Sequence, residues 1–322
     1  MDIRGTYMDN NNYFETLAAG TATFPSNATS LNLWNNNITN LSILQGCDEL
    51  RILNLSDNPL ENLAPLTKLT KLEELDLSVC ELTTIEHLSE LRSLKKLNVS
   101  SNDIEDFSDL GALTQLEQLD ISYNQCTEIA SLAFLSNLTR LIISSNHVTN
   151  LKAIIDLNSL EYLEASFNEL RDFPDISSMS NMRHLDLSFN HIRDVNVQFI
   201  PTTLRFLDLS NNSTRFNGDL RWMNSLETLN LANNNLTTTD AVVHLKRIKH
   251  LDLSGNRITN VDALTELETL EELDLSDNEI KNISLLYKLP HLKRLNLSGN
   301  PEDVGKQAFY LRVQMPKCEI IV

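Results

Sequence analysis

Acidic side chains recur along this sequence at multiples of a 22-residue step. They are Asp76, Asp120, Glu164, Asp186, Asp208, Asp252 and Asp274. Stacked carboxylates repel one another unless a cation matches them, so the first interpretation is a surface for a partner with basic groups. Calcium is disfavoured, because a flat ladder of carboxylates does not wrap an ion with about six to eight oxygens. The alternative is structural, since aspartate at this position can pair with neighbouring serine and asparagine side chains.

Aromatic side chains form a second group in the middle of the chain. They lie at outward positions of the repeat, where exposed rings reduce solubility and clustered rings typically mark a contact surface. The predicted partner-binding residues are Tyr123, Ile142, Tyr162, Glu164, Phe167, His184, Asp186, Phe189, Phe206 and Asp208. The competing interpretation is that the rings lie flat over serines of neighbouring strands and only fill the floor.

Catalysis is not indicated. The sequence lacks the glycine-rich phosphate-binding motifs, H-E-x-x-H and G-x-S-x-G. His147 and His191 share a frame position, but they lie two repeats apart, about 10 Å by strand spacing, which is too far to share a metal. We therefore predict a protein that is not an enzyme and has no metal or cofactor. Nucleic-acid binding is also disfavoured, because neutralising phosphates needs a basic stripe and the chain has a net charge of −18.

A repeated frame positions these residues. Asparagine stands at steps of 22 from Asn36 to Asn300, and Cys80 fills the one gap. Around each position the chain follows L-x-x-L-x-L-x-x-N-x-I/L. Because successive side chains of a strand face opposite sides, the leucines of L-x-L point to the core and the residue between them points outward. The asparagine amide can donate and accept, so it can satisfy backbone groups of its own and the neighbouring coil; cysteine does this less well.

The second half of each repeat has aliphatic residues at every third position, as in Ile85, Leu88 and Leu91. This spacing fits a 3-10 turn or a polyproline-like path better than a full α-helix. One repeat cannot cover its own apolar face, so the repeats must stack. The predicted fold class is an α/β repeat solenoid, a right-handed superhelix with a curved parallel β-sheet on the concave side and short 3-10 or irregular turns on the convex side.

The frame, present thirteen times, is that of leucine-rich repeats. Its uniform 22-residue period resembles the subfamily that includes the nuclear regulatory subunit of protein phosphatase 1. The C-terminal run Asn300-Pro301, Tyr310-x-Arg312 and Met315-Pro316 resembles the cap of that group. The resemblance covers residues 28–322 and implies a phosphatase catalytic subunit as partner. Bacterial internalins share the period but resemble this chain less, because they end in a different module and carry a secretion signal.

Three segments are expected. Residues 1–27 form an N-terminal cap, in which Tyr13, Phe14 and Leu17 have the spacing of one apolar helix face. Residues 28–300 form thirteen repeats, and residues 301–322 form a C-terminal cap helix and tail, with the helix over 302–313.

The compartment is inferred from the N-terminus and the cysteines. The start of the chain lacks a basic segment followed by an apolar run, and no stretch approaches the ~18 apolar residues that span a bilayer. Cys47, Cys80 and Cys126 occupy frame positions of three different coils, and no C-x-x-C pair exists, which favours a reducing compartment. We expect a monomeric protein of the cytoplasm, nucleus or cytoskeleton that contacts no membrane.

Repeats eight and nine depart from the frame. Gln198 and Asn217 stand where other repeats carry core aliphatics, so the convex wall is expected to bulge, with Phe216 or Trp222 compensating. Such rule-breaking indicates either a lateral docking site or drift that the stack tolerates.

Three functions fit these features. The first is a non-catalytic protein-interaction scaffold that binds a partner, such as a protein phosphatase catalytic subunit or a basic segment, in its concave face. The second is a cytoskeletal, axonemal or spindle-pole anchoring protein whose ends or convex side bind. The third is an internalin-like adhesin, which predicts a secretion signal upstream of Met1.

Overall fold

A computed structural model describes residues 24–322 of the chain. These residues fall into two compact units, one ending at Leu160 and one beginning at Glu161. The predicted N-terminal cap, with Tyr13, Phe14 and Leu17, lies outside the described residues except for its last four positions.

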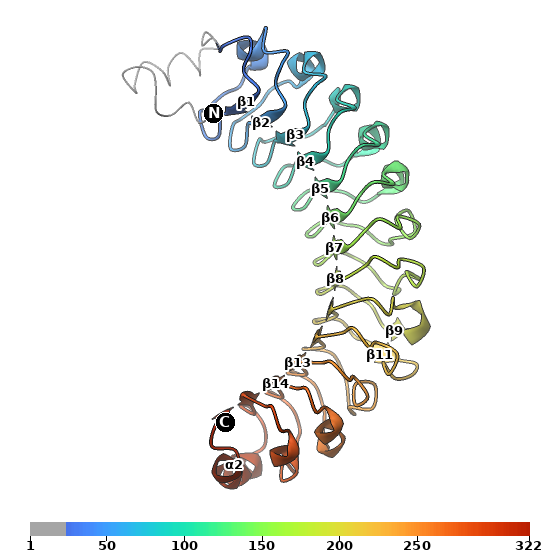
Figure 1. The fold of residues 1–322 in the computed structure, drawn as a ribbon, viewed down its shortest axis with the longest axis vertical. Coiled ribbons are helices and arrows are strands. Elements are labelled where there is room, and N and C mark those ends of the chain that lie inside the picture. The colour runs from blue at the N-terminus through green and yellow to red at the C-terminus, as the bar shows by residue number, and fades with distance from the viewer. Residues whose placement is uncertain (1–23) are drawn as a thin grey trace, which may run out of the picture. The chain divides into compact units, whose positions relative to one another are not determined.

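The first unit is a stack of coils, each of which contributes one short strand to a parallel sheet. Within residues 24–160 the strands are β1 (Ser30–Asn32), β2 (Ile52–Asn54), β3 (Glu74–Asp76), β4 (Lys96–Asn98), β5 (Gln118–Asp120) and β6 (Arg140–Ile142). The 3-10 turns are η2 (Leu41–Leu44), η3 (Ala64–Lys68), η4 (Leu88–Glu90), η5 (Ser108–Ala112) and η6 (Ala130–Phe134). The strands lie along one side of the coils and the turns along the other (Figure 1).

The second unit repeats this arrangement. Its sheet contains β7 (Tyr162–Glu164), β8 (His184–Asp186), β10 (Phe206–Asp208), β12 (Thr228–Asn230), β13 (His250–Asp252), β14 (Glu272–Asp274), β15 (Arg294–Asn296) and β16 (Glu319–Ile321). On the opposite side lie η7 (Val197–Phe199), η8 (Asp262–Glu266), η9 (Leu286–Lys288) and a small sheet of β9 (Asp194–Val195) and β11 (Arg215–Phe216), and the chain continues into α2 (Glu302–Gln314).

From β1 to β6 and from β7 to β15, neighbouring strands of the sheet pair in a register of 22 residues, for example Leu31 with Leu53 and Leu251 with Leu273, and β15 pairs with β16 across 25 residues. The repeat solenoid of parallel strands and 3-10 turns is therefore confirmed. The 3-10 turns follow from the three-residue aliphatic spacing, because a helix with three residues per turn presents every third side chain to the same side. In η4 that side chain is Leu88, which is fully buried.

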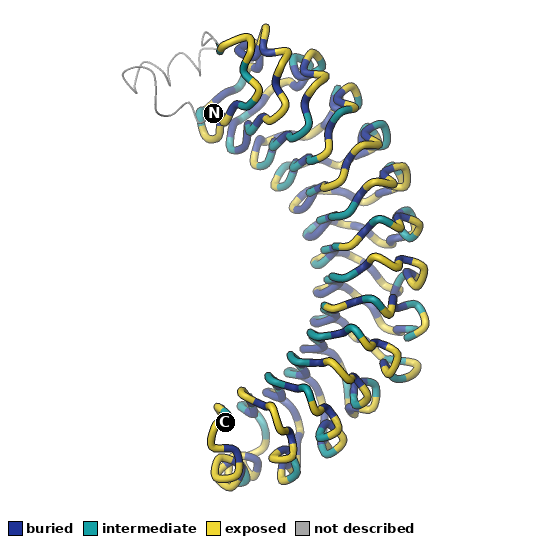
Figure 2. Tube along the Cα trace, viewed as in Figure 1, coloured by how far each residue is buried: buried dark blue, intermediate teal, exposed yellow. Residues whose placement is uncertain are grey.

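The core runs through the centre of every coil, with exposed residues on the outside (Figure 2). It contains the two leucines of each L-x-L and the aliphatic residues of the turns. Cys47, Cys80 and Cys126 are buried in three different coils, as predicted, and Cys318 is half-buried. Burial raises the pKa of the Cys80 and Cys126 thiols to about 11.

In repeats eight and nine, the residues that fill the core are not the ones predicted from the sequence. Gln198 and Asn217 are exposed, and Ile200 is buried beside η7. Trp222 does not compensate, since it is 70% exposed, and Phe216 is half-buried in β11. The back of the coils therefore rearranges into the β9–β11 sheet.

The helix expected over residues 302–313 is α2. It buries Val304, Ala308 and Leu311. The side chain of Gln307 also holds the helix to the preceding coil, because its oxygen accepts from the Ile283 N–H and its amide donates to the Lys281 carbonyl.

Candidate functional site

Three of the predicted residues form one stack on the strand face of the second unit. Tyr162, His184 and Phe206 are register partners on β7, β8 and β10. The His184 ring lies 4.0 Å from the Tyr162 ring centroid and 4.1 Å from that of Phe206, with interplanar angles of 5° and 6°. The Tyr162 hydroxyl donates to the Glu164 carboxylate, which lies 4.0 Å from His184 Nε2. The three rings thus present one continuous edge to solvent, each of them half-buried.

A second stack lies at the end of the same strands. The rings of Phe167 and Phe189 are stacked with centroids 4.0 Å apart and an interplanar angle of 9°. They remain 52% and 43% exposed. Within each stack the rings therefore pack against one another, face to face. This arrangement argues against the interpretation in which each ring lies flat over the serines of neighbouring strands.

The backbone of the second stack is unfavourable for phenylalanine. The residue before the frame asparagine has a positive φ, from 51° to 70°, at Asn35, Asp57, Val79, Ser101, Tyr123, Ser145, Phe167, Phe189, Asn211, Asn233, Gly255, Asp277 and Gly299. Glycine, asparagine and aspartate tolerate this left-handed conformation, whereas other L-residues incur a cost of roughly 1–2 kcal/mol. Rings at this position cost stability, and strain of this kind clusters at functional sites.

An acidic column lies between the two stacks. Glu164, Asp186 and Asp208 are register partners on the central outward position of their strands. The structural interpretation of these acids is supported, because Oδ1 of Asp186 and of Asp208 each accepts the N–H of the serine two residues later at 2.8 Å. Oδ2 of Asp208 accepts from the Asn230 amide at 2.8 Å. Burial, with the nearby Asp186 carboxylate, raises the pKa of Asp208, so a basic partner would relieve an unfavourable charge.

The other two predicted residues belong to the first unit. Tyr123 has a φ of 54° and is 63% exposed, so it shares the left-handed position of the phenylalanines. Ile142 ends β6 and is half-buried. The structure thus brings together Tyr162, Glu164, Phe167, His184, Asp186, Phe189, Phe206 and Asp208 on one face of the second unit.

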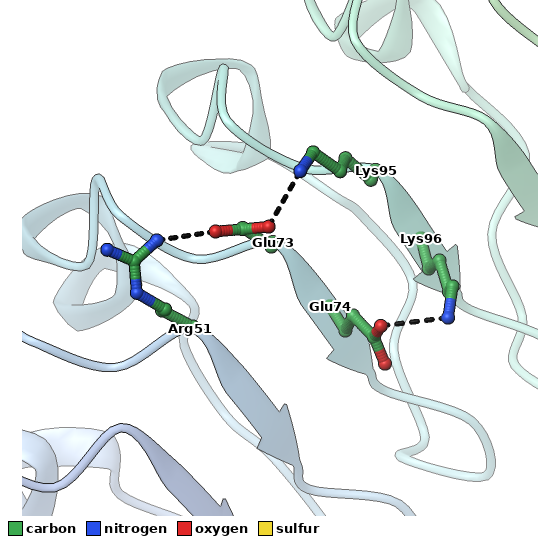
Figure 3. A network of polar contacts seen from close by, with 5 residues as sticks. All are labelled: Arg51, Glu73, Glu74, Lys95 and Lys96. Atoms are coloured by element: carbon green, nitrogen blue, oxygen red, sulfur yellow. Dashed lines mark hydrogen bonds and ion pairs between the residues drawn. The ribbon is translucent and has the colours of Figure 1, made fainter.

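The strand face of the first unit has a different character. A groove of about 400 Å³ runs across β2 to β6 there. Charged side chains pair across the strands: Glu73 contacts Arg51 at 2.5 Å and Lys95 at 2.8 Å, and Glu74 contacts Lys96 at 2.8 Å (Figure 3). Exposed pairs of this kind satisfy each other and contribute little stability. Glu74 and Lys96 stand in the outward column that carries Tyr162, His184 and Phe206 in the second unit, and further along the second unit the column again carries a charged pair, Glu272 with Arg294 at 3.1 Å.

A further groove of about 280 Å³ extends from Phe206 across β12 to β15. Its floor includes Asp252, whose Oδ1 accepts from the N–H and hydroxyl of Ser254 at 2.9 and 2.7 Å. Burial is the largest cause that raises the pKa of Asp252, and the Asp274 carboxylate adds to it.

Replacing Asp252 with asparagine is expected to stabilise the protein at pH 7. The folded state binds the Asp252 proton more tightly than the unfolded state, so this group's contribution is fully present below the unfolded pKa and is lost as pH rises through the raised folded pKa. Urea unfolding from pH 3 to 8 should show a variant that gains stability over the parent as pH rises. Asp48→Asn, at an exposed site, is the control. A constant difference across this range would contradict the expectation.

Two features on the strand faces of the two units were not predicted from the sequence. One is the left-handed backbone of Tyr123, Phe167 and Phe189, whose signal was available: asparagine, aspartate or glycine fills that position in seven of the thirteen repeats. The other is the exposed valine at the same position, Val79.

Within residues 24–322, no three His, Cys, Asp or Glu side chains gather closely enough to hold a metal ion. None of the helices in that range combines the length and hydropathy needed to cross a bilayer.

Family models for leucine-rich repeats match most of the sequence. A model described as leucine-rich repeats in two copies matches residues 29–68, 70–112, 92–135, 224–266 and 268–304. Two further leucine-rich-repeat models match residues 114–170 and 178–198. A search of the curated proteins gave no match.

Solved structures of similar fold come from several sources. An internalin, InlF, from Listeria monocytogenes is 23% identical over 96% of this chain and 88% of that chain, with a TM-score of 0.83. A leucine-rich-repeat protein from Leptospira interrogans is 22% identical over 99% of this chain and 100% of that chain, with a TM-score of 0.73. A plant peptide hormone receptor, RGFR1, in complex with RGF2 is 22% identical over 93% of this chain and 60% of that chain, with a TM-score of 0.64.

Proposed function

The chain belongs to the leucine-rich-repeat family, and from this membership we propose that it is a non-catalytic scaffold that binds a protein partner on the strand face of residues 161–322. Proteins of this family generally bind other molecules on their repeats, and the plant receptor of similar fold is in complex with RGF2. The function must nevertheless be argued from the site, because the fold serves many roles.

The observation that carries the proposal is the pair of ring stacks with an acidic column between them. Phe167 and Phe189 hold their rings in solvent on a backbone that disfavours phenylalanine. Solvent exposure and backbone strain both lower the stability of the free protein, and a partner that buries the rings offsets this cost.

The chemistry of the face defines the partner. The rings would contact apolar or aromatic side chains of the partner. The acidic column of Glu164, Asp186 and Asp208 would pair with lysine or arginine side chains that lie between those apolar contacts. A basic segment with flanking apolar residues fits both. The resemblance of the repeat period and C-terminal run to the phosphatase 1 nuclear regulatory subunit makes a phosphatase catalytic subunit the specific candidate.

The location is part of the same proposal. We place the protein in the cytoplasm or nucleus, with a cytoskeletal association as the alternative. The thiols of Cys47, Cys80 and Cys126 support this, because they are free and buried in different coils of the described region.

A second candidate function is that of an assembly or anchoring protein that binds through other surfaces. It is favoured by large apolar side chains away from the strand face: Trp222 is 70% exposed, and on α2 Phe309, Tyr310 and Val313 are 66%, 72% and 72% exposed. In this case the strand face would be a spacer and the back or the C-terminal helix would bind.

A pull-down separates the two functions. Changing Tyr162, Phe167 and Phe206 to alanine is expected to weaken capture of the partner at least about 30-fold, because ring anchors at the centre of an interface contribute about 2 kcal/mol or more. The bait is the full chain, and the prey is purified phosphatase 1 catalytic subunit in one arm and cell extract in the other. Partner retained at full strength by the triple variant ends the strand-face proposal.

Two variants serve as controls. Phe134→Ala removes a ring that is 66% exposed on η6, outside the proposed face, and should leave capture unchanged. Trp222→Ala together with Phe309→Ala should leave capture unchanged under the first function and abolish it under the second. If only the extract yields a partner, the scaffold function stands and the phosphatase assignment is wrong.

A further inference from the structure

The core pattern of the second unit is interrupted on the side opposite the strand face. Thr214, Asn217 and Thr239 stand where the frame has aliphatic residues in other repeats, such as Ile258 and Val261. Thr214 and Thr239 are buried, whereas Asn217 is exposed and turns to the preceding coil. Its oxygen accepts from the Val197 N–H at 3.0 Å, and its amide donates to Asn196 Oδ1 at 3.2 Å.

This interruption leaves an open edge on the β9–β11 sheet. The Arg215 N–H donates to the Arg193 carbonyl and the Asn217 N–H to the Val195 carbonyl, so both face β9. Because backbone groups alternate along a strand, the N–H and C=O of Phe216 face the other way. Within residues 24–322 neither group has a hydrogen-bond partner in the protein.

The next coil does not close this edge. In other coils the N–H after the frame asparagine donates to the preceding coil, as Arg257 does to the Leu236 carbonyl at 2.9 Å and Glu279 to the Ile258 carbonyl at 3.1 Å. The equivalent bond from Asn235 is missing in the described part of the chain. The two coils therefore separate beside β11.

A cleft of about 620 Å³ fills the separation. Its apolar lining comprises Phe216, Leu231, Leu236, Val242 and Leu253. Phe216 and Leu236 are half-buried and form its accessible apolar wall, whereas Leu231, Val242 and Leu253 are at most 1% exposed and lie beneath the floor. This size is within the range of about 300–1,000 Å³ that is typical of ligand-binding clefts.

The rim has one carboxylate without an ion pair. Asp219 is held by Arg221 through two hydrogen bonds of 2.7 and 2.6 Å, and Arg215 lies 3.6 Å from Asp194. Asp240 also lines the cleft, is exposed, and has no ion-pair partner among the described residues.

We propose that this cleft binds an extended peptide segment of another protein by strand addition to β11, with an aliphatic side chain in the cleft and a lysine or arginine beside Asp240. The open N–H and C=O of Phe216 specify an extended main chain, which is the ligand that pairs with a sheet edge. The apolar lining favours an aliphatic side chain of the peptide, and the Asp240 carboxylate favours a positively charged one. This site is distinct from the strand face, since β9 and β11 lie on the opposite side of the coils (Figure 1).

The test is a selection followed by a matched pair of variants. A phage-displayed library of random 12-residue peptides is selected on the full chain, and enriched peptides are synthesised and titrated by calorimetry. Enriched sequences are expected to share an aliphatic residue with a basic residue nearby. Phe216→Pro removes the N–H that faces the cleft and keeps the two β9 bonds of residues 215 and 217, and proline is tolerated at such an edge position. Phe216→Val keeps the N–H and is the control.

The expected result is a dissociation constant at least about tenfold weaker for Phe216→Pro than for Phe216→Val, from the loss of one main-chain hydrogen bond and the clash at the edge. Asp240→Asn should weaken the peptides with a basic residue and leave variants with alanine at that position unchanged. A peptide methylated on the backbone nitrogens of its pairing edge should not bind.

Three results would overturn the proposal. One is a library that yields no peptide above background. Another is equal affinity for the proline and valine variants, with both folded by circular dichroism. The third is binding that is lost in the variant with Tyr162 and Phe206 changed to alanine and kept in Phe216→Pro, which would place the peptides on the strand face.

Discussion

Replacing Phe167 and Phe189 together with asparagine is expected to weaken partner binding at least about 30-fold and to raise the free energy of unfolding by about 0.5–3.5 kcal/mol. The variant loses a stacked pair, which contributes about 0.5–1.5 kcal/mol. It also relieves two left-handed residues, each of which costs phenylalanine roughly 1–2 kcal/mol. The chain already contains the replacement, because Asn233 donates to Asn211 Oδ1 at 3.1 Å in the same frame position.

The alanine pair is the informative comparison. Alanine loses the stack and keeps the strain, so Phe167→Ala with Phe189→Ala should be about 1 kcal/mol per position less stable than the asparagine pair. Chemical denaturation measures stability, and the pull-down measures binding, which should fall at least about 30-fold in both pairs. If the rings only cover the strand face and bind no partner, the asparagine pair should have the same free energy of unfolding as the alanine pair, and partner binding should be unchanged.

Val79 supplies a control for the backbone effect. It has a φ of 56° and is 50% exposed in the first unit. Val79→Asn should raise stability by about 1 kcal/mol and leave binding unchanged, because it relieves the same strain outside the proposed face.

The fold could be predicted from the sequence because the leucine-rich frame repeats with a constant period of 22 residues. Each L-x-L dictates a strand with a known outward residue, so the positions of Tyr162, His184 and Phe206 on neighbouring strands follow from their common column and the 22-residue register. Sequence reasoning could place the rings in columns. It could not show that they stack on each other, since that depends on side-chain rotamers.

The remaining features arise where local rules are broken. A phenylalanine in a left-handed position contradicts its own preference, so the conformation of Phe167 and Phe189 is indicated only by the asparagine, aspartate or glycine at the same position of seven other repeats. The β9–β11 sheet and its cleft form because Thr214, Asn217 and Thr239 cannot fill a core, and a pattern of missing aliphatics does not specify what replaces them. In α2, the burial of Val304, Ala308 and Leu311 and the exposure of Phe309 and Tyr310 depend on how the helix is rotated on the last coil.

The asparagine ladder leads to the other large effect. Asn58 accepts the N–H groups of Asn36 and Ile38 at 3.0 and 2.9 Å, and its amide donates to the Leu33, Leu55 and Ser56 carbonyls at 2.9, 2.7 and 3.2 Å. Asn58 is 1% exposed. Water therefore cannot replace these bonds, and a buried backbone group left unpaired costs about 1–3 kcal/mol.

Cys80 interrupts this ladder. Its thiol contacts the Leu55 and Ser78 carbonyls at 3.3 and 3.4 Å. Because cysteine has no side-chain oxygen to accept it, the Leu60 N–H donates instead to the Cys80 backbone carbonyl at 3.2 Å. Burial holds the pKa of the thiol at about 11, so it remains a neutral, weak donor at neutral pH.

Cys80→Asn is therefore expected to raise the free energy of unfolding by about 1–2 kcal/mol, because the new amide donates to two carbonyls and its oxygen accepts from the coil before it. The reciprocal change, Asn58→Cys, should lower it by about 2–3 kcal/mol, since two N–H groups lose their acceptor. Urea unfolding of both variants and of the double variant measures these effects. Asparagine at position 80 that destabilises the protein would mean that the coils have packed around the thiol, and that the ladder at this position is set by volume rather than by hydrogen bonding.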